Sequence, residues 1–191
     1  MSCRFRSVAL GLLLALVGGA MPAQAQLKDE NLLVAMPQGF KVAMSESRNG
    51  LIMQEWVPEK ESVQNWTEMV TVQIFLNRAD IDPVQFLGLM EKQWAGACKG
   101  STASPPTVGK VNGYAAAMSL LRCPLLAQTG KPETTMFRAL KGNDSFYLVQ
   151  RAVRAVPDEA RLLQMRQYLE TVSLCDTRRP AQACPTMAPA K

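Results

Sequence analysis

The sequence predicts an α+β fold in which helices cover an antiparallel sheet. Two Asn-Gly pairs, at 49–50 and 112–113, separate runs of strand-forming residues, and Asn-Gly is preferred in tight hairpin turns. Two other segments repeat apolar residues at three- and four-residue steps, which is typical of amphipathic helices. The order is strands, a helix, strands and a second helix. This order predicts an antiparallel sheet that carries helices.

The first half of the chain is predicted to form a hairpin, a third strand and a helix. After a polar lead-in, Phe40, Val42 and Met44 alternate with Lys, Ala and Ser. Asp82-Pro83 begins the helix, because Asp accepts hydrogen bonds from first-turn amides and proline has no amide to leave unpaired there. The expected elements are strands at 40–45, 51–57 and 69–76, a helical turn at 62–66 and a helix from 83 to near Cys98.

The second half is predicted to be an antiparallel meander that ends in a helix. Residues 100–106 are expected to form a loop. The last helix begins at Pro157-Asp158-Glu159, has one apolar face and is expected to stop near Cys175. The expected strands are 107–111, 114–123, 134–140 and 146–153.

The last strand is apolar on both of its faces. Phe146 and Leu148 point one way, whereas Tyr147, Val149 and Val153 point the other. A strand of this kind is covered on both sides. We therefore expect the two long helices to pack against the sheet as an α/β/α sandwich.

The first 25 residues have the layout of a secretory signal peptide. Arg4 and Arg6 form a positive n-region, an apolar run spans 8–17, and a small-x-small cleavage site ends at Ala25. The run is too short for a membrane anchor, because about ten residues rise about 15 Å as a helix, roughly half of a hydrocarbon core. We expect cleavage after Ala25, a periplasmic or secreted protein and no stable membrane anchor after cleavage.

The predicted organisation is a signal peptide (1–25), a single α+β domain (26–176), and a disulfide-closed loop with a Pro/Ala-rich disordered tail (177–191). The formal net charge is +5 for the full chain, and its basic residues are scattered. This distribution gives no support to nucleic-acid binding.

Four cysteines follow the leader, and an even number in an exported chain indicates two disulfides. Three connectivities are possible. We favour Cys98 with Cys123 and Cys175 with Cys184, because each pair spans a segment that is expected to turn back on itself. No Cys-x-x-Cys spacing indicates a zinc or redox site.

The chain contains no histidine. This removes the Ser-His-Asp and Cys-His nucleophile systems, the most common metal ligand and the usual general base near neutral pH. The sequence also lacks Ser-x-x-Lys, phosphate-loop and dinucleotide-binding motifs. We expect no cofactor, no metal site and no catalytic residue.

Four segments resemble the PsbP-like superfamily, which includes the DcrB-like envelope proteins of bacteria. They are Met36–Phe40, Glu55–Pro58, Asn65–Phe75 and Tyr147–Gln150. The resemblance covers most of residues 32–175 and implies a six- or seven-stranded antiparallel sheet flanked by helices. It also implies a binding or assembly scaffold without a shared catalytic centre. The missing lipid anchor departs from the DcrB-like pattern.

The segment from Glu55 to Glu68 is the best candidate binding site, since loops on rigid scaffolds concentrate binding groups. If its tryptophans are exposed, they would be strong anchors for a partner. The alternative is that they are buried and plug the edge of the sheet. Arg151 could add an anion site, or its stem could simply cover apolar surface. The candidate binding residues are Trp56, Glu59, Glu61, Trp66, Glu68 and Arg151.

Three functions follow from these features. The first is a non-catalytic binding or accessory protein of the cell envelope, whose protein or small-molecule partner is unknown. The second is a small hydrolase that uses a carboxylate pair such as Glu55 and Glu68, which requires both in one cleft. The third is a carrier with a small-molecule pocket between sheet and helix.

Overall fold

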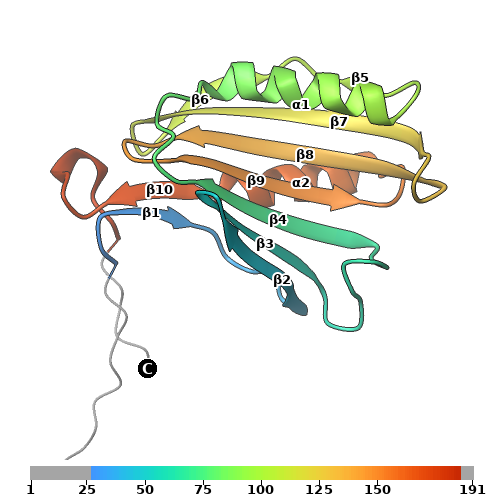
Figure 1. The fold of residues 1–191 in the computed structure, drawn as a ribbon, viewed down its shortest axis with the longest axis horizontal. Helices are drawn as coiled ribbons and strands as arrows, with labels where there is room; N and C mark the ends of the chain where they lie inside the picture. Colours follow the sequence, from blue (N-terminus) through green and yellow to red (C-terminus); the bar gives the residue numbers. More distant parts are fainter. Residues whose placement is uncertain (1–26, 186–191) are drawn as a thin grey trace, which may run out of the picture.

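An eight-stranded antiparallel sheet lies between two helices, which confirms the predicted α+β class (Figure 1). The computed structural model describes residues 27–185. The helices are α1 (Pro83–Ala97) and α2 (Glu159–Glu170). The predicted signal peptide and the tail from residue 186 lie outside the described residues.

The main sheet has the order β2-β3-β4-β9-β8-β7-β5, and β6 also pairs with β7. One of its strands, β5, has only two residues and lies within the segment 100–106 that was expected to be a loop. It pairs with Leu121 and Arg122 of β7. The strands are β2 (Phe40–Arg48), β3 (Leu51–Pro58), β4 (Glu68–Phe75), β5 (Thr102–Ala103), β6 (Thr107–Val111), β7 (Tyr114–Leu126), β8 (Lys131–Lys141) and β9 (Phe146–Val153).

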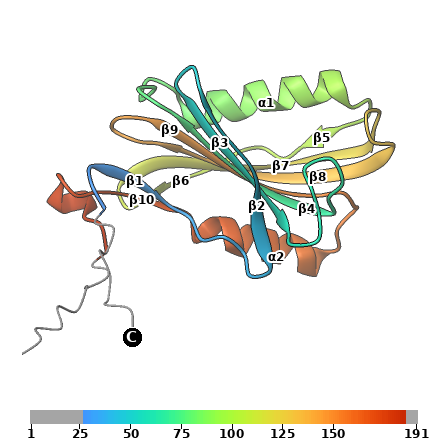
Figure 2. The ribbon, with the colours of Figure 1, turned by 60° about the horizontal axis from the view of Figure 1, so that its bottom comes forward.

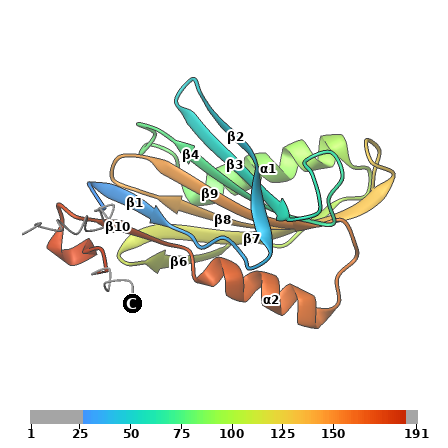
Figure 3. The ribbon, with the colours of Figure 1, turned by 90° about the horizontal axis from the view of Figure 1, so that it is seen from below.

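The two helices cover opposite faces of the sheet (Figures 2 and 3). On one face Phe146 and Leu148 of β9 pack in a cluster with Leu87 of α1. On the other face Tyr147 and Val149 pack with Met165 and further residues of α2. The alternation expected for this strand is therefore the basis of an α/β/α arrangement. In Figure 1 the β2–β3 hairpin lies beyond the part of the sheet that the helices cover.

Local chemistry forms both predicted hairpins and both helix starts. Asn49, Gly50, Asn112 and Gly113 all have positive φ, as a tight hairpin turn requires. The Asp82 carboxylate accepts hydrogen bonds from the amides of residues 84 and 85, and Asp158 caps α2 in the same way.

The helical turn expected at 62–66 does not form. Ser62 and Asn65 instead exchange two backbone hydrogen bonds, of 3.2 and 3.1 Å. The Glu61 carboxylate then accepts hydrogen bonds from the Thr67 amide and hydroxyl, each at 2.7 Å. The connection is thus a closed hairpin-like loop, because these local bonds satisfy the backbone without helix.

Helix α2 ends at Glu170 and does not continue to Cys175 as expected. The following residues form β10 (Ser173–Asp176), which pairs with β1 (Glu30–Leu33) in a separate two-stranded sheet. Strand β1 falls in the segment expected to be a polar lead-in. Its pairing partner lies at the other end of the described chain, so no local pattern announces it.

One carboxylate anchors β1 to the main sheet. Glu30 accepts hydrogen bonds from the amides of Asn143, Asp144 and Ser145 in the β8–β9 turn, and from the Tyr147 hydroxyl. The turn is so tight that a Cβ on Gly142 would collide with the Glu30 carboxylate and would lie 2.7 Å from the Ser145 carbonyl oxygen. Glycine is therefore required at this position.

Cys98 is bonded to Cys123, and Cys175 is bonded to Cys184. The first bond joins the residue after α1 to β7, in a buried position. The second closes a loop that contains a short 3₁₀ helix, η1 (Pro180–Gln182). Each bond thus fixes the end of a helix or strand to its neighbour.

We predict that replacing Cys98 and Cys123 with serine lowers the free energy of unfolding by about 3 kcal/mol, since the bond closes a long loop in the unfolded chain. The Cys175→Ser/Cys184→Ser variant, with its sequence separation of 9 against 25, should lose less. Urea unfolding without reductant measures both losses. Equal stability of wild type and the 98/123 variant would contradict this role.

Asp176 of β10 is fully buried and is bound by Arg178. The guanidinium donates to Asp176 Oδ1 at 2.8 Å and Oδ2 at 2.7 Å, and to Asp144 Oδ2 at 2.6 Å. These hydrogen bonds lower the pKa of Asp176 to about 2. Since the pKa of an unfolded-state Asp is about 3.9, this group contributes its full stabilisation above about pH 4 and loses it as the pH falls toward 2.

We therefore predict that Asp176→Asn flattens the pH dependence of unfolding between pH 4 and 2. The stability of the wild type should fall more steeply over this window than that of the variant. Urea midpoints at a series of pH values test the slope, with Glu59→Gln as an exposed control. Parallel curves for wild type and D176N would refute it.

Candidate functional site

The structure separates the two candidate tryptophans. Trp56 is 6% exposed and faces the α2 side, where its Nε1 donates to Gln54 Oε1 at 3.2 Å. Trp66 is equally buried, but it packs with Val57 and Met69 in a different cluster. Neighbouring residues of a strand face opposite ways, so Val57 marks the face opposite to Trp56. The two indoles do not form one exposed anchor.

Arg154 closes the outer side of Trp66. Its guanidinium carbon lies 4.0 Å from the centre of the indole ring, and its Nη1 donates to the carbonyls of Gln64 and Trp66. Of the remaining candidates in this connection, Glu59 is exposed and Glu61 holds the Thr67 end of the loop. The connection is stabilised from within, and this internal packing accounts for Trp66.

Glu68 is the central charge of the region. It is 9% exposed, and its Oε1 accepts from Arg151 Nε at 2.6 Å, while Arg161 of α2 binds its second oxygen. Arg151 also lies over the Tyr168 ring, 4.7 Å from its centre. The Tyr168 hydroxyl donates to the Ala35 carbonyl at 2.8 Å, and burial raises the pKa of this tyrosine to about 12. The cluster joins β4, β9 and α2.

Glu55 and Glu68 do not form a carboxylate pair. Glu55 pairs with Thr71 in the register of β3 and β4, and Glu68 lies three residues before Thr71 on the same strand. The two side chains therefore point to opposite faces of the sheet. Partial burial raises the pKa of Glu55, and the carboxylate on its face in the neighbouring strand is Glu46, which lies opposite Met53. This geometry rules out Glu55 and Glu68 as the acid and base of one hydrolase site.

A groove that the sequence analysis did not anticipate lies on the α2 side of β3 and β4. Its volume is about 650 Å³. We call it the β1 groove, because β1 and the residues after it form one wall. The floor consists of Ile52, Gln54, Trp56, Val72 and Ile74; Leu32 and Val34 line the wall, and Asp29, Glu30, Asn31, Asn77, Asp144 and Ser145 are the polar residues around it.

The floor of the groove was detectable in the sequence, but its wall was not. Ile52 and Trp56 alternate along one strand, Val72 and Ile74 alternate along the next, and Ile52 pairs with Ile74, which places all four on one face. A helix would be expected to cover such a face, yet α2 packs on β8 and β9 instead. The long-range pairing of β1 with β10 places β1, and not a helix, beside this face.

Strand β2 forms one edge of the main sheet, since β3 is its neighbour in the strand order. The register shifts between Val42 and Met44, which marks a bulge, and Val42 is 46% exposed. An edge strand presents backbone donors and acceptors to one side. The β2 edge lies one strand away from the β3 residues that form part of the groove floor.

Within residues 27–185, the helices are too short and too polar to cross a membrane. In the same residues, no group of three His, Cys, Asp or Glu side chains is arranged to hold a metal ion.

No family model matches this chain, and no curated protein sequence matches it. Solved structures are similar in fold. The Ran-binding protein Mog1p of Saccharomyces cerevisiae aligns with a TM-score of 0.49 and 11% identity, over 80% of this chain and 98% of Mog1p.

Two further structures align over most of both chains. LpqN of Mycobacterium tuberculosis, described as involved in cell envelope biogenesis, has a TM-score of 0.42 and 13% identity over 78% of this chain and 86% of LpqN. The PsbP of Synechocystis sp. PCC 6803 has a TM-score of 0.42 and 11% identity over 84% of this chain and 98% of that one. At these values the similarities assign neither a family nor a function.

We predict that Glu68→Gln lowers the free energy of unfolding by about 3 kcal/mol, because it leaves Arg151 buried without its counter-charge. The exposed Glu59→Gln variant should change stability by less than about 0.5 kcal/mol. The double variant Glu68→Leu/Arg151→Met should lose less than E68Q, since it removes both buried charges together. Chemical unfolding measures all three, and an E68Q protein as stable as wild type would disprove the anchoring role.

Proposed function

We propose that this chain is an exported, non-catalytic binding protein of the bacterial cell envelope. It takes an extended segment of a protein partner along the β2 edge and in the β1 groove. The leader-like N-terminus and the two disulfides support export to an oxidising compartment. The resemblance of four sequence segments to DcrB-like envelope proteins is a further reason for this proposal.

One observation carries the proposal: an open groove has an apolar floor on β3 and β4, and the edge strand β2 is the next strand beyond β3. An extended peptide that adds to a sheet edge gains main-chain hydrogen bonds, and its alternate side chains enter pockets on one face. Here Ile52, Trp56, Val72 and Ile74 would receive those side chains. Partner binding of this kind requires no new helix or loop.

The polar residues around the groove already have structural partners. Glu30 accepts three hydrogen bonds from the β8–β9 turn and a fourth from the Tyr147 hydroxyl. Asp144 pairs with Arg178 at 2.6 Å, and Asp29 lies 3.8 Å from the same guanidinium. The groove therefore offers apolar surface and backbone edge more than reactive groups, which favours binding over catalysis.

A small-molecule carrier is the second candidate. The groove volume of about 650 Å³ lies within the range of about 300–1,000 Å³ that is usual for ligand pockets. An apolar ligand would bury the same floor residues but would not use the β2 edge. The two candidates are separated by whether Val42 on the edge takes part.

We predict that a photo-crosslinking amino acid at Ile52 or at Val42 forms protein adducts in the native envelope, whereas one at Met53 forms far fewer. Met53 lies on the same strand as Ile52 but on the opposite face. Mass spectrometry of the adducts identifies the partner segment. Ile52→Lys should abolish adducts from Val42, with Met53→Lys as the matched control.

Crosslinks from Ile52 to a small molecule, without protein adducts from Val42, would favour the carrier. Equal adduct yields from Ile52 and Met53 would refute the groove as the binding face. Both lysine variants are first compared with wild type by thermal unfolding.

A further inference from the structure

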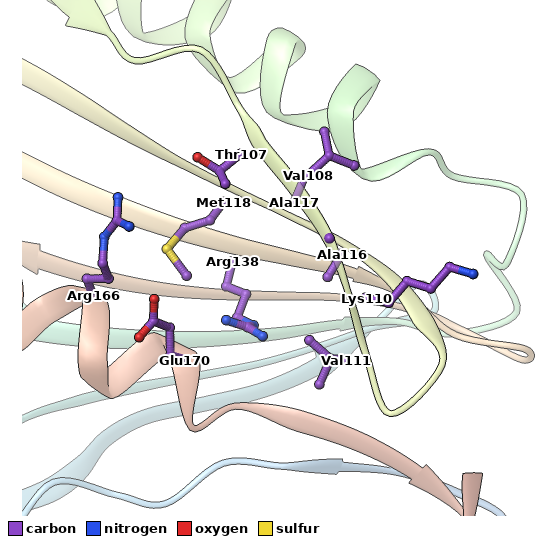
Figure 4. Close-up of a pocket in the computed structure, with 11 residues that line it drawn as sticks. Thr107, Val108, Lys110, Val111, Ala116, Ala117, Met118, Arg138, Arg166 and Glu170 are labelled. Carbon is purple, nitrogen blue, oxygen red and sulfur yellow. The ribbon is translucent and has the colours of Figure 1, made fainter. Parts of the chain in front are cut away.

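A second pocket lies on the other side of α2, over β6, β7 and β8 (Figure 4). Its volume is about 140 Å³. We call it the Arg138 pocket, after the buried arginine of β8 that lines it. Its other lining residues include Thr107, Gly109, Val111, Ala116, Met118, Arg166 and Glu170.

Arg138 is a buried cation that forms no salt bridge within the described residues 27–185. It is 9% exposed, and within residues 27–185 no atom accepts a hydrogen bond from its buried Nε. Desolvation lowers the pKa of this guanidinium, and the carboxylate that opposes this effect is Glu170. Glu170 is the last residue of α2 and is exposed.

Two partly buried arginines among the described residues have partners for their guanidinium groups. Arg151, on the same face of the neighbouring strand, holds the Glu68 carboxylate at 2.6 Å. Arg154 stacks on Trp66 and its Nη1 donates to two backbone carbonyls, although its Nε, like that of Arg138, has no acceptor among the described residues. Burying a charge is unfavourable unless hydrogen-bonding partners replace water. Arg138 thus retains unused capacity to bind an anion.

Two small residues leave the space above Arg138. Gly109 of β6 lies directly opposite Ala116 of β7, and Met118, two residues further along β7, lies opposite Arg138. All four therefore face the α2 side. A Cβ added to Gly109 would meet no atom within 4 Å. The space exists because a glycine stands where a strand would usually place a larger side chain.

Helix α2 supplies the rim. Arg166 and Glu170 are four residues apart on the helix and so lie on one face of it. Figure 4 shows the two side chains on the helix side of the pocket and Arg138 on the sheet side. The pocket therefore has a cation at its base, apolar walls formed by Val111, Ala116 and Met118, and a mixed charge pair at its mouth.

We propose that the Arg138 pocket binds a small oxyanion, a carboxylate or a phosphate, carried on a short apolar body. A planar guanidinium matches both groups through two parallel hydrogen bonds. A cavity of about 150 Å³ holds a benzene-sized molecule, so this pocket fits an anion of about six heavy atoms. The site is separate from the β1 groove and does not depend on the function proposed for it.

NMR titration of the purified chain tests the proposal with three probes of matched size: butyrate, ethyl phosphate and the neutral butyramide. Butyrate or ethyl phosphate should shift the amide signals of Gly109, Ala116 and Met118 in a saturable way, and butyramide should not. The tighter of the two anions identifies the class of headgroup. Absence of saturable shifts with both anions would overturn the proposal.

Arg138→Met should weaken the tighter anion at least about tenfold, because it removes a charged hydrogen-bond donor. Arg48→Gln removes an equal charge at an exposed position of β2 and should leave the affinity unchanged. Glu170→Gln should raise the affinity, since it removes the carboxylate that competes for Arg138. Equal weakening by R48Q and R138M would indicate diffuse charge attraction and would overturn the site.

Two measurements protect the test against a folding artefact. Gly109→Val fills the pocket without touching Arg138, and should abolish anion binding while the protein stays folded. R138M should raise the thermal midpoint of the unliganded protein, because it removes a buried charge. A lowered midpoint with unchanged anion affinity would assign Arg138 to the fold alone and refute the proposal.

Discussion

The ion cluster of Glu68 with Arg151 and Arg161 determines where α2 lies, and much of this molecule depends on that position. The carboxylate sits at the start of β4, one arginine belongs to the adjacent β9, and the other belongs to the helix. A carboxylate that is nearly sealed from water must keep both partners. The helix is thus held over β8 and β9, where Met165 and Leu169 enter the core.

Because α2 covers the middle of this face, space remains on both sides of it. Toward β3 and β4 lies the β1 groove, and toward β6 and β7 lies the Arg138 pocket. The two spaces differ in chemistry. The groove is wide, has an apolar floor, and its Glu30 is fully engaged. The pocket is small, and the Nε of its arginine has no hydrogen-bond acceptor among the described residues. The position of α2 therefore leaves two separate candidate binding sites on this face.

Strand β1 illustrates how a remote contact shapes a site. Its hydrogen bonds to β10 and the bonds of Glu30 to the β8–β9 turn place the N-terminal segment beside the sheet. Gly142 allows the carboxylate to approach, and the Cys175–Cys184 bond holds the segment that follows β10. Without these contacts the floor of the groove would be an open apolar surface. Three separate parts of the chain therefore build one wall.

The sequence by itself determined the features whose cause is local. Asn-Gly pairs formed the hairpins, Asp82 and Asp158 started the helices, and the two-sided apolar pattern of β9 predicted a covered sheet. Tertiary structure alone decided the partners of charges and of isolated strands. Side-chain parity could place Trp56 and Glu68 on one face, but it could not show which of Arg138 and Arg151 finds a carboxylate. The energy of a buried charge depends on what lies across the interface, and that is set by chain segments far apart in sequence.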